Sequence, residues 1–164
     1  MKIIGIDPGQ TGGIVQIDGD GKILKKFGIP IIKSGYKVII DLVGLRKVFE
    51  EISDSDFIFI EKVHSMPRDS PASAFKFGST FGIKLGLIIA FKIPFDMVAP
   101  NTWTKKMHAD MDKTMNSKKR SLIVAQRLYP NEKFLLTPKC SKPHDGLIDA
   151  TLIAEYGRRY ILNR

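Results

Sequence analysis

Short apolar runs separated by glycine-rich breaks fill the first thirty residues, and this pattern restricts the fold more than any other feature. The runs cover residues 2–7, 14–18 and 22–29, and the breaks fall at residues 8–13 and 19–21. Short β-branched runs joined by glycine turns are typical of strands that pair with their sequence neighbours. The sequence therefore predicts an antiparallel meander of three strands at the start of the chain.

The remaining residues alternate between helical and strand-like patterns. Apolar spacing near 3.6 residues predicts a helix over residues 38–52, and an apolar run predicts a buried strand at 57–60. The later elements are expected as a helix at 70–91, a strand at 95–98, and helices at 101–108, 117–129 and 145–162, begun by Asn101, Ser117 and Asp145. This order predicts a single α/β domain over residues 1–164, in which helices flank a mixed sheet.

Two carboxylates stand at the ends of expected strands. Asp7 closes the first strand and Glu61 follows the buried strand at 57–60. Alternation along a strand places Asp7 on the face of Ile3 and Gly5, and Glu61 on the face of Phe57 and Phe59. If the two strands are parallel neighbours, both acids emerge at the carboxyl edge of the sheet, where open α/β sheets bind ligands.

A second pair of acids lies on the last expected helix. Asp145 and Asp149 are four residues apart and share one helical face. Asp149 also falls on the apolar stripe of Leu152, Ile153 and Tyr156, where a carboxylate is costly unless a cation offsets it. A bound metal ion would relieve both the burial cost and the mutual repulsion of the two acids.

Each acid alone also has a structural interpretation. Asp7 suits a turn, Glu61 suits a surface strand end, and Asp145 suits a helix N-cap, whereas Asp149 on a buried face is harder to explain. Together, four carboxylates without a thiolate favour Mg²⁺ or Mn²⁺ over Zn²⁺. Two such ions can stabilise the attacking and leaving oxygens in phosphodiester hydrolysis.

The charge balance narrows the choice of partner. Lysine and arginine number 26 against 17 acidic residues, so the formal net charge is +9. A surplus of this size attracts polyanions, with nucleic acid the first candidate and an anionic membrane surface the second. Cys140 is the single cysteine, which excludes an internal disulfide and a CxxC metal site.

No targeting or membrane-spanning segment is expected. Asp7 interrupts the apolar N-terminal run, which argues against a signal peptide. The most apolar stretch, residues 81–91, contains Lys84 and is too short to cross a membrane. We therefore expect no membrane partner and a cytoplasmic or nucleoid-associated protein, or one acting in the host cell if the chain is viral.

Several blocks resemble the RuvC family of Holliday junction resolvases, in order and in spacing. The acidic blocks are GIDPGQTGG at 5–13, IE at 60–61 and HDGLIDA at 144–150. Three further blocks are similar to the phage and chloroplast branches, namely EKVHSMPR at 61–68, VAPNTWTKK at 98–106 and SKKRS at 117–121. The resemblance covers nearly the whole chain.

The resemblance implies a ribonuclease-H-like fold, a symmetric homodimer and Mg²⁺-dependent paired nicks across a four-way DNA junction. The expected catalytic and metal-binding residues are Asp7, Glu61, Asp145 and Asp149. Bacterial relatives have their late acids three residues apart, which would put the fourth acid at Gly146, so Asp145 is the expected substitute and His144 an alternative ligand or proton shuttle. DNA repair and recombination are the expected settings.

The expected DNA contacts lie around the site, and each has the alternative of plain solvated charge. They are His64, Met66, Arg68, Lys76, Lys105, Lys106, Lys118, Lys119 and Arg120. His64 and Met66 occupy the stretch where family members often carry an aromatic wedge that opens the junction centre. Trp103 could stack on a base, but its size favours the core.

The helix at 70–91 carries a stripe of aromatic residues and glycines. Core packing is expected for two of the three aromatics Phe75, Phe77 and Phe81. Gly78 and Gly82 would let a symmetry mate approach closely, which suits a two-fold dimer.

Three other functions remain open on the sequence alone. The GIDPGQTGG block also resembles the phosphate loop of sugar-kinase and actin-like ATPases, but those proteins need two such lobes, so no nucleotide cofactor is expected. A ribonuclease H or another nuclease of the same fold, acting on flaps or RNA–DNA hybrids, would use the same chemistry. A non-catalytic junction binder would gain nothing from four carboxylates that repel DNA.

Overall fold

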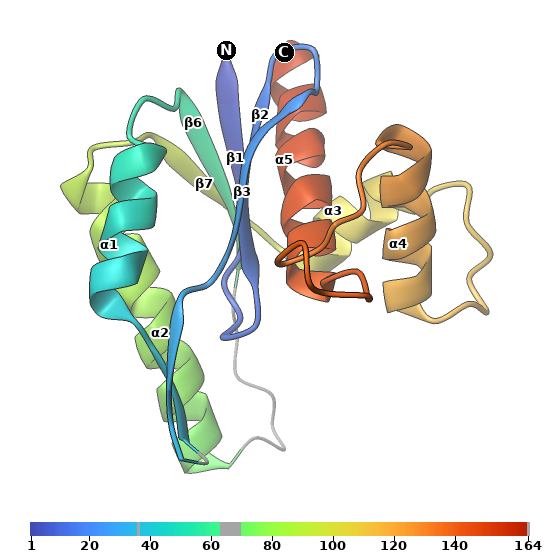
Figure 1. Cartoon of the computed structure of the whole chain (residues 1–164). Helices are drawn as coiled ribbons and strands as arrows, with labels where there is room; N and C mark the ends of the chain where they lie inside the picture. The colour runs from blue at the N-terminus through green and yellow to red at the C-terminus, as the bar shows by residue number, and fades with distance from the viewer. Residues whose placement is uncertain (36, 63–69, 164) are drawn as a thin grey trace.

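A mixed five-stranded sheet lies between two helical layers in this computed structural model, which describes residues 1–35, 37–62 and 70–163 (Figure 1). The strands of this sheet are β1 (Lys2–Asp7), β2 (Gly13–Asp18), β3 (Ile23–Gly28), β6 (Phe57–Glu61) and β7 (Phe95–Val98). They are ordered β3-β2-β1-β6-β7, so β1 is the central strand. β1 pairs antiparallel with β2 and parallel with β6.

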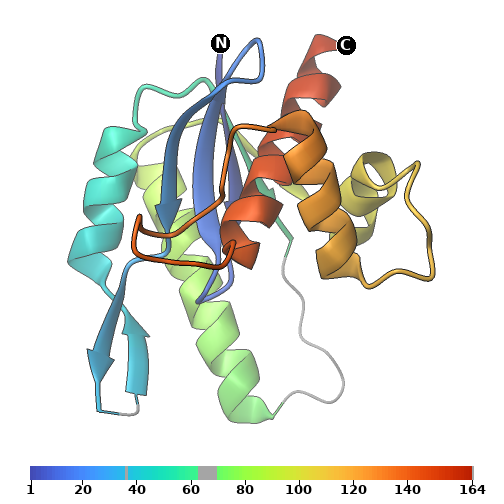
Figure 2. The same cartoon turned by 45° about the vertical axis from the view of Figure 1, so that its right-hand side comes forward.

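The helices divide between the two faces of the sheet. On one side lie α1 (Leu42–Glu51) and α2 (Pro71–Ala90), and on the other lie α3 (Pro100–Met107), α4 (Ser117–Leu128) and α5 (Asp145–Leu162) (Figures 1 and 2). Each face has its own apolar core. Ile4, Ile6 and Ile58 belong to the core on the α1–α2 side, while Ile3 and Phe59 belong to the core on the α5 side. Alternate side chains of β1 and β6 therefore contribute to opposite cores.

Glycines let α5 pack directly on the central strand. A Cβ atom added to Gly5 would lie 2.0 Å from the backbone oxygen of Ala150, so no side chain fits between β1 and α5. Gly12 forms an isolated β-bridge with Gly146, and a Cβ atom on Gly146 would lie 2.5 Å from the Gly12 backbone. These contacts fix the start of α5 against the loop that follows Asp7.

Several expected elements are confirmed. The meander is present as β1, β2 and β3 with antiparallel pairing throughout. The helix expected at 70–91 is α2, with Ser70 as its N-cap and Phe91 as its C-cap. The helix expected at 145–162 is α5. The fold class, a mixed sheet flanked by helices, is confirmed as well.

The helix expected at 38–52 is wrong over its first four residues. Residues Lys37–Ile40 form β5, which pairs antiparallel with β4 (Ile31–Ser34) in a separate two-stranded ribbon. The helix begins only at Leu42, because the Asp41 side chain accepts a hydrogen bond from the N–H of Gly44. The β-branched residues of the ribbon favour a strand, although their spacing also fits a helix.

Three expected helix caps are displaced by one or two residues. α3 begins at Pro100 after Ala99, so Asn101 lies inside the helix. Asn116, rather than Ser117, caps α4. His144, rather than Asp145, caps α5. Proline suits a first helical position because its missing N–H would have no partner there, which explains the early start of α3.

Half of α2 projects beyond the sheet and is exposed (Figure 2). Phe75 is 78% exposed and Phe77 is 37% exposed, whereas Phe81 packs against the core on the α1–α2 side. The expectation that two of these aromatics pack in the core is therefore wrong, since only Phe81 does so. Among the described residues α2 is long and apolar enough to cross a membrane by length and composition, but its inner half packs on the sheet through Ile88.

Candidate active site

Asp7 and Glu61 emerge side by side at the carboxyl edge of the sheet. β1 and β6 are parallel neighbours, and Ile6 is paired with Ile60 immediately before the two acids. Adjacent strands run about 4.8 Å apart, so the two side chains start from neighbouring positions. The parallel neighbourhood expected from the sequence is confirmed.

The side chain of Asp7 is half-buried. Burial raises the pKa of the Asp7 carboxyl, while the backbone N–H of Gly9 and the charge of Lys84 act in the opposite direction. The N–H of Gly9 donates to Asp7 Oδ1 at 3.0 Å. The loop after β1 therefore holds one carboxylate oxygen in place.

Asp149 faces the other acids from the first turns of α5. Burial, together with the negative charges of Asp7, Glu61 and Asp145, raises the pKa of Asp149 to about 7. A hydrogen bond from Ser121 of α4 acts against this rise. The charges of the other three acids therefore act on the Asp149 carboxyl, as expected for a cluster that binds cations.

Asp145 occupies a different setting. Its side chain is 55% exposed and lies 2.6 Å from the ammonium of Lys118. The neighbouring position 146 abuts the backbone of Gly12 and has no room for a side chain. The steric restriction gives a physical reason why the acid stands four residues before Asp149 rather than three.

His144 has a structural role at the start of α5. Its Nδ1 atom accepts a hydrogen bond from the N–H of Leu147 at 3.2 Å and so caps the helix. This bond fixes the ring beside Asp145. A role of His144 as a metal ligand or proton shuttle remains a prediction, and it would have to use Nε2.

Trp103 is 3% exposed and packs in the core on the α5 side, as expected. Its indole Nε1–H also donates to Glu61 Oε1 at 2.8 Å, a contact that the sequence does not reveal. The buried ring therefore orients one of the four acids. Trp103 is a positioning residue of the candidate site.

We expect Trp103→Phe to lower the cleavage rate by roughly 10–100-fold, because partners that orient metal ligands have effects of this size. The free energy of unfolding should fall by only about 1–2 kcal/mol, since an apolar ring remains. Ile17→Val is the matched control, since Ile17 lies in the same core and pairs with Ile3, near the end of β1 opposite Asp7. If both variants cut DNA at equal rates per folded molecule, the hydrogen bond to Glu61 does not position that acid.

Lys84 interrupts the most apolar stretch of the sequence, but the sequence does not reveal its relation to the acids. It lies on α2, is 0% exposed, and its Nζ donates to the backbone oxygen of Thr80 at 3.1 Å. Burial lowers the pKa of Lys84 to about 8, and the charge of Asp7 acts to raise it. A buried cation on α2 thus acts electrostatically on the first acid.

The donor set fits a hard divalent cation. Asp7, Glu61 and Asp149 supply only carboxylate oxygens, which Mg²⁺ prefers. Burial and the neighbouring acids both disfavour the charged form of Asp149, and a bound cation would offset both effects. Within the described part of the chain, no three His, Cys, Asp or Glu side chains are arranged to hold an ion as they stand. The carboxylates would therefore have to turn toward a bound ion.

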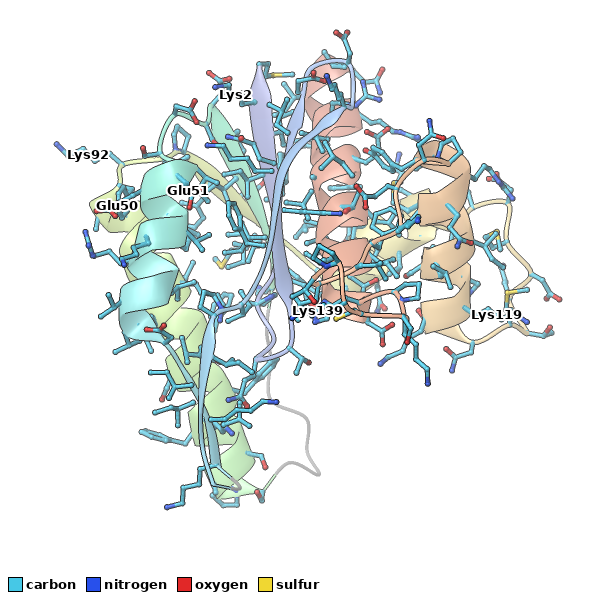
Figure 3. All side chains as sticks on the ribbon, in the orientation of Figure 1. Lys2, Glu50, Glu51, Lys92, Lys119 and Lys139 are labelled. Carbon is cyan, nitrogen blue, oxygen red and sulfur yellow. The ribbon has the colours of Figure 1, made fainter. Side chains whose placement is uncertain are left out.

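Basic side chains flank the acids along α3 and α4. An open pocket of about 680 Å³ between these helices is lined by Lys105, Lys113 and Arg120. The Nε atom of Arg120 is buried without a hydrogen-bond partner among the described residues. Figure 3 shows Lys119 at the start of α4 and Lys139 beside the start of α5, at the end of the molecule where the acids lie.

A short polar chain connects this basic pocket to Asp149. His108 lines the pocket, and its Nε2 atom lies 3.2 Å from Ser121 Oγ. Ser121 in turn hydrogen-bonds to Asp149. Burial and the charge of Arg120 lower the pKa of His108, which favours the neutral ring. A neutral ring can donate from Nε2 to Ser121, and Ser121 can then donate to Asp149.

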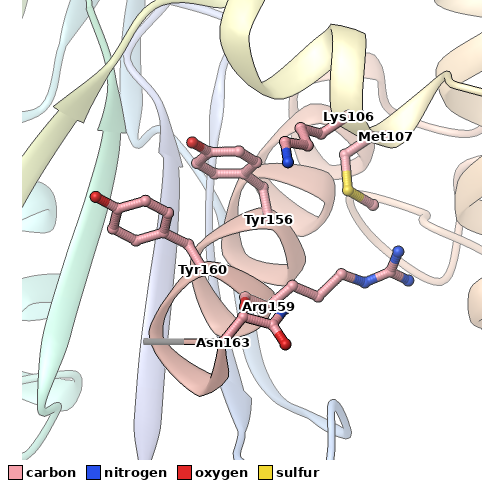
Figure 4. A pocket seen from close by; sticks show the side chains of 6 residues that line it. All are labelled: Lys106, Met107, Tyr156, Arg159, Tyr160 and Asn163. Atoms are coloured by element: carbon pink, nitrogen blue, oxygen red, sulfur yellow. Dashed lines mark hydrogen bonds between the residues drawn. The ribbon is translucent and has the colours of Figure 1, made fainter.

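The other predicted DNA contacts differ in their exposure and in their distance from the acids. Lys76, Lys105, Lys106, Lys118 and Lys119 are exposed, and Arg120 is half-buried. Lys106 lies apart from the acids, in a pocket of about 360 Å³ between α3 and the end of α5, together with the stacked rings of Tyr156 and Tyr160 (Figure 4). His64, Met66 and Arg68 lie outside the described residues, so their roles stay predictions.

Comparisons with known proteins support the fold alone. No family model and no curated protein sequence matches the chain. The structure of T. thermophilus RuvC in complex with Holliday junction substrate matches with a TM-score of 0.66 and 17% identity, covering 99% of this chain and 96% of that one. A Thermus thermophilus RuvC structure matches with a TM-score of 0.59 and 18% identity, covering 99% and 97%. The chain therefore has the ribonuclease-H-like fold of RuvC.

Proposed function

We propose that this protein is a Mg²⁺-dependent endonuclease that resolves four-way DNA junctions by paired symmetric nicks. The observation that carries this proposal is the meeting of Asp7, Glu61 and Asp149 at one edge of a RuvC-like sheet. The net charge of +9 supports a nucleic-acid substrate. The Holliday junction bound to the T. thermophilus protein supports the branched form of that substrate.

The chemistry would be metal-assisted hydrolysis of a phosphodiester. Asp7, Glu61 and Asp149 would hold the ions, with Asp145 or His144 completing the set. Two Mg²⁺ ions, for which Mn²⁺ can substitute, would activate the attacking water and stabilise the leaving 3′ oxygen. Trp103 and Ser121 hold the Glu61 and Asp149 side chains, so less order has to be gained when substrate binds.

The basic pocket between α3 and α4 would hold the DNA backbone next to the acids. Lys105, Lys113 and Arg120 offer charge-assisted hydrogen bonds to phosphate oxygens. Lys118 lies between this pocket and the acids, through its contact with Asp145. Contacts of this kind position a strand without reading its sequence, which suits recognition by branch shape.

A homodimer would supply the two sites that two nicks require. The exposed half of α2 carries Phe75 and Phe77, and Cβ atoms added to Gly78 and Gly82 would meet nothing within 4 Å. An exposed apolar helix with an open glycine face suits close packing against a second copy. α2 also begins close after Glu61 in the sequence, so this packing would bring two sites into one assembly.

The test is a cleavage panel with Mg²⁺. The purified protein should cut a synthetic four-way junction into nicked duplexes that ligase can seal, because symmetric nicks leave 5′-phosphate and 3′-hydroxyl ends. Cleavage of linear duplex should be at least about tenfold slower, since only the junction can occupy both sites of a dimer. Chelation of the metal should stop cleavage and leave binding intact.

The panel also separates the alternatives. Equal cleavage of flaps or RNA–DNA hybrids would contradict a resolvase and support another nuclease of this fold. Binding without cleavage in either Mg²⁺ or Mn²⁺ would contradict an enzyme and support a junction-binding protein. A monomer on the bound junction, measured by sedimentation, would contradict the paired mechanism.

A further inference from the structure

Lys84 is a buried charge on a helix that is otherwise apolar over its last ten residues. Residues 81–90 contain no other charged side chain, and Lys84 is 0% exposed. Moving an ammonium group out of water is costly unless an opposite charge or a set of acceptors compensates. A methionine or leucine would fill a similar volume without this cost, so the charge itself requires an explanation.

The charge that acts on Lys84 connects it with the acidic edge of the sheet. Its Nζ atom has one backbone acceptor, Thr80 O at 3.1 Å in the preceding turn of α2. The opposite charge that acts on it is Asp7, and Lys84 acts on Asp7 in the same way. Asp7 comes from the central strand and is half-buried, so water screens the attraction between the two charges only in part.

We propose that Lys84 is a built-in counter-charge of the acidic cluster, which partly offsets the charge of Asp7 before a metal ion arrives and thereby weakens metal binding by the free protein. The inference rests on the proposed function, because it assigns Asp7 to a metal site. It makes Lys84 a positioning residue and not a metal ligand, since an ammonium group has no acceptor for a cation.

The consequence is a coupling between metal binding and substrate binding. In the free protein, a divalent cation near Asp7 is repelled by the ammonium of Lys84. A DNA phosphate that enters the site brings negative charge, which offsets this repulsion and favours the ion. The free enzyme would therefore hold its ions loosely, and the substrate would complete the site.

The experiment measures Mn²⁺ binding to the DNA-free protein near pH 7 by isothermal titration calorimetry, and it does not depend on cleavage. For Lys84→Met we expect the dissociation constant for Mn²⁺ to fall about tenfold, as expected when one nearby unit charge is removed in a partly screened setting. Lys84→Arg should stay within about threefold of the wild type, because the charge is kept. Lys84→Gln gives a second neutral variant if Lys84→Met does not fold.

The control is Lys47→Met, which removes an exposed charge from the neighbouring helix α1, outside the expected DNA contacts, and should leave Mn²⁺ affinity unchanged. A second measurement adds a junction that cannot be cut because a methylene group replaces the bridging 3′ oxygen at the cleavage site. This junction should tighten Mn²⁺ binding more for the wild type than for Lys84→Met. Unchanged or weaker Mn²⁺ binding by both neutral variants would overturn the inference.

Failure of the proposed function would give a different result. The wild-type protein would then bind no Mn²⁺ and leave a four-way junction uncut. Failure of the inference alone would leave metal binding and cleavage by the wild type intact, and only the variants at position 84 would behave otherwise than expected.

Discussion

Asp7→Asn should bind a four-way junction with wild-type affinity or better and cut it at least roughly 10³-fold more slowly. The amide keeps an oxygen that can accept from the N–H of Gly9, so the loop should stay folded. It removes a negative charge that a metal ion requires, and loss of one strong electrostatic element at a reacting centre typically costs this much. Single-turnover cleavage and a gel-shift titration measure the two quantities.

The matched control is Asp110→Asn, which makes the same change at an exposed acid paired with Arg127. Its cleavage rate should equal that of the wild type. A comparable loss in both variants would mean that the effect reflects net charge. Full activity of Asp7→Asn would remove Asp7 from the metal site and with it the proposed mechanism.

Asp149→Asn should stabilise the metal-free protein at alkaline pH while abolishing cleavage. The folded state raises the pKa of Asp149 to about 7, from an ordinary value of 3.8, chiefly through burial. A raised pKa means that the stability contribution of this group is complete below about pH 4 and is lost as the pH rises through about 7. The neutral amide does not suffer this loss.

The difference between the two proteins should therefore grow with pH. In chelator, the free energy of unfolding of Asp149→Asn should exceed that of the wild type by about 1–3 kcal/mol at pH 8, and the excess should shrink by pH 5. Urea denaturation at the two pH values measures this. Saturating Mg²⁺ should reverse the order, because only the wild type gains from the ion. If the free energies of unfolding of the two proteins in chelator differ by the same amount at both pH values, ionisation of Asp149 does not destabilise the folded protein.

Local patterns sufficed to predict the elements that carry the acids. Asp7 and Glu61 end β-branched runs, and alternation along a strand fixes their faces, so their meeting depended only on β1 and β6 being neighbours. The 3.6-residue period of residues 145–162 predicted α5 and the inward position of Asp149. The ribbon of β4 and β5 was missed because its isoleucines also fit a helical stripe.

Contacts between distant residues could not be predicted in this way. The bond from Trp103 to Glu61 spans 42 positions, and the electrostatic influence of Lys84 on Asp7 connects α2 with the central strand. Ser121 reaches Asp149 only because α4 packs beside α5. A single sequence shows the period of each element but not which side chains meet across elements.

The packing of α5 on β1 has a consequence for the order of folding. Gly5 and Gly12 belong to the first elements of the chain, yet their close contacts, Ala150 and Gly146, belong to the last. Contacts between such distant segments close a large loop and form slowly. An intermediate in which β1 and β6 are paired but α5 is undocked would bring Asp7 and Glu61 together without Asp149. We therefore expect nuclease activity to recover later than strand structure during refolding, so that partly folded chains remain harmless to DNA.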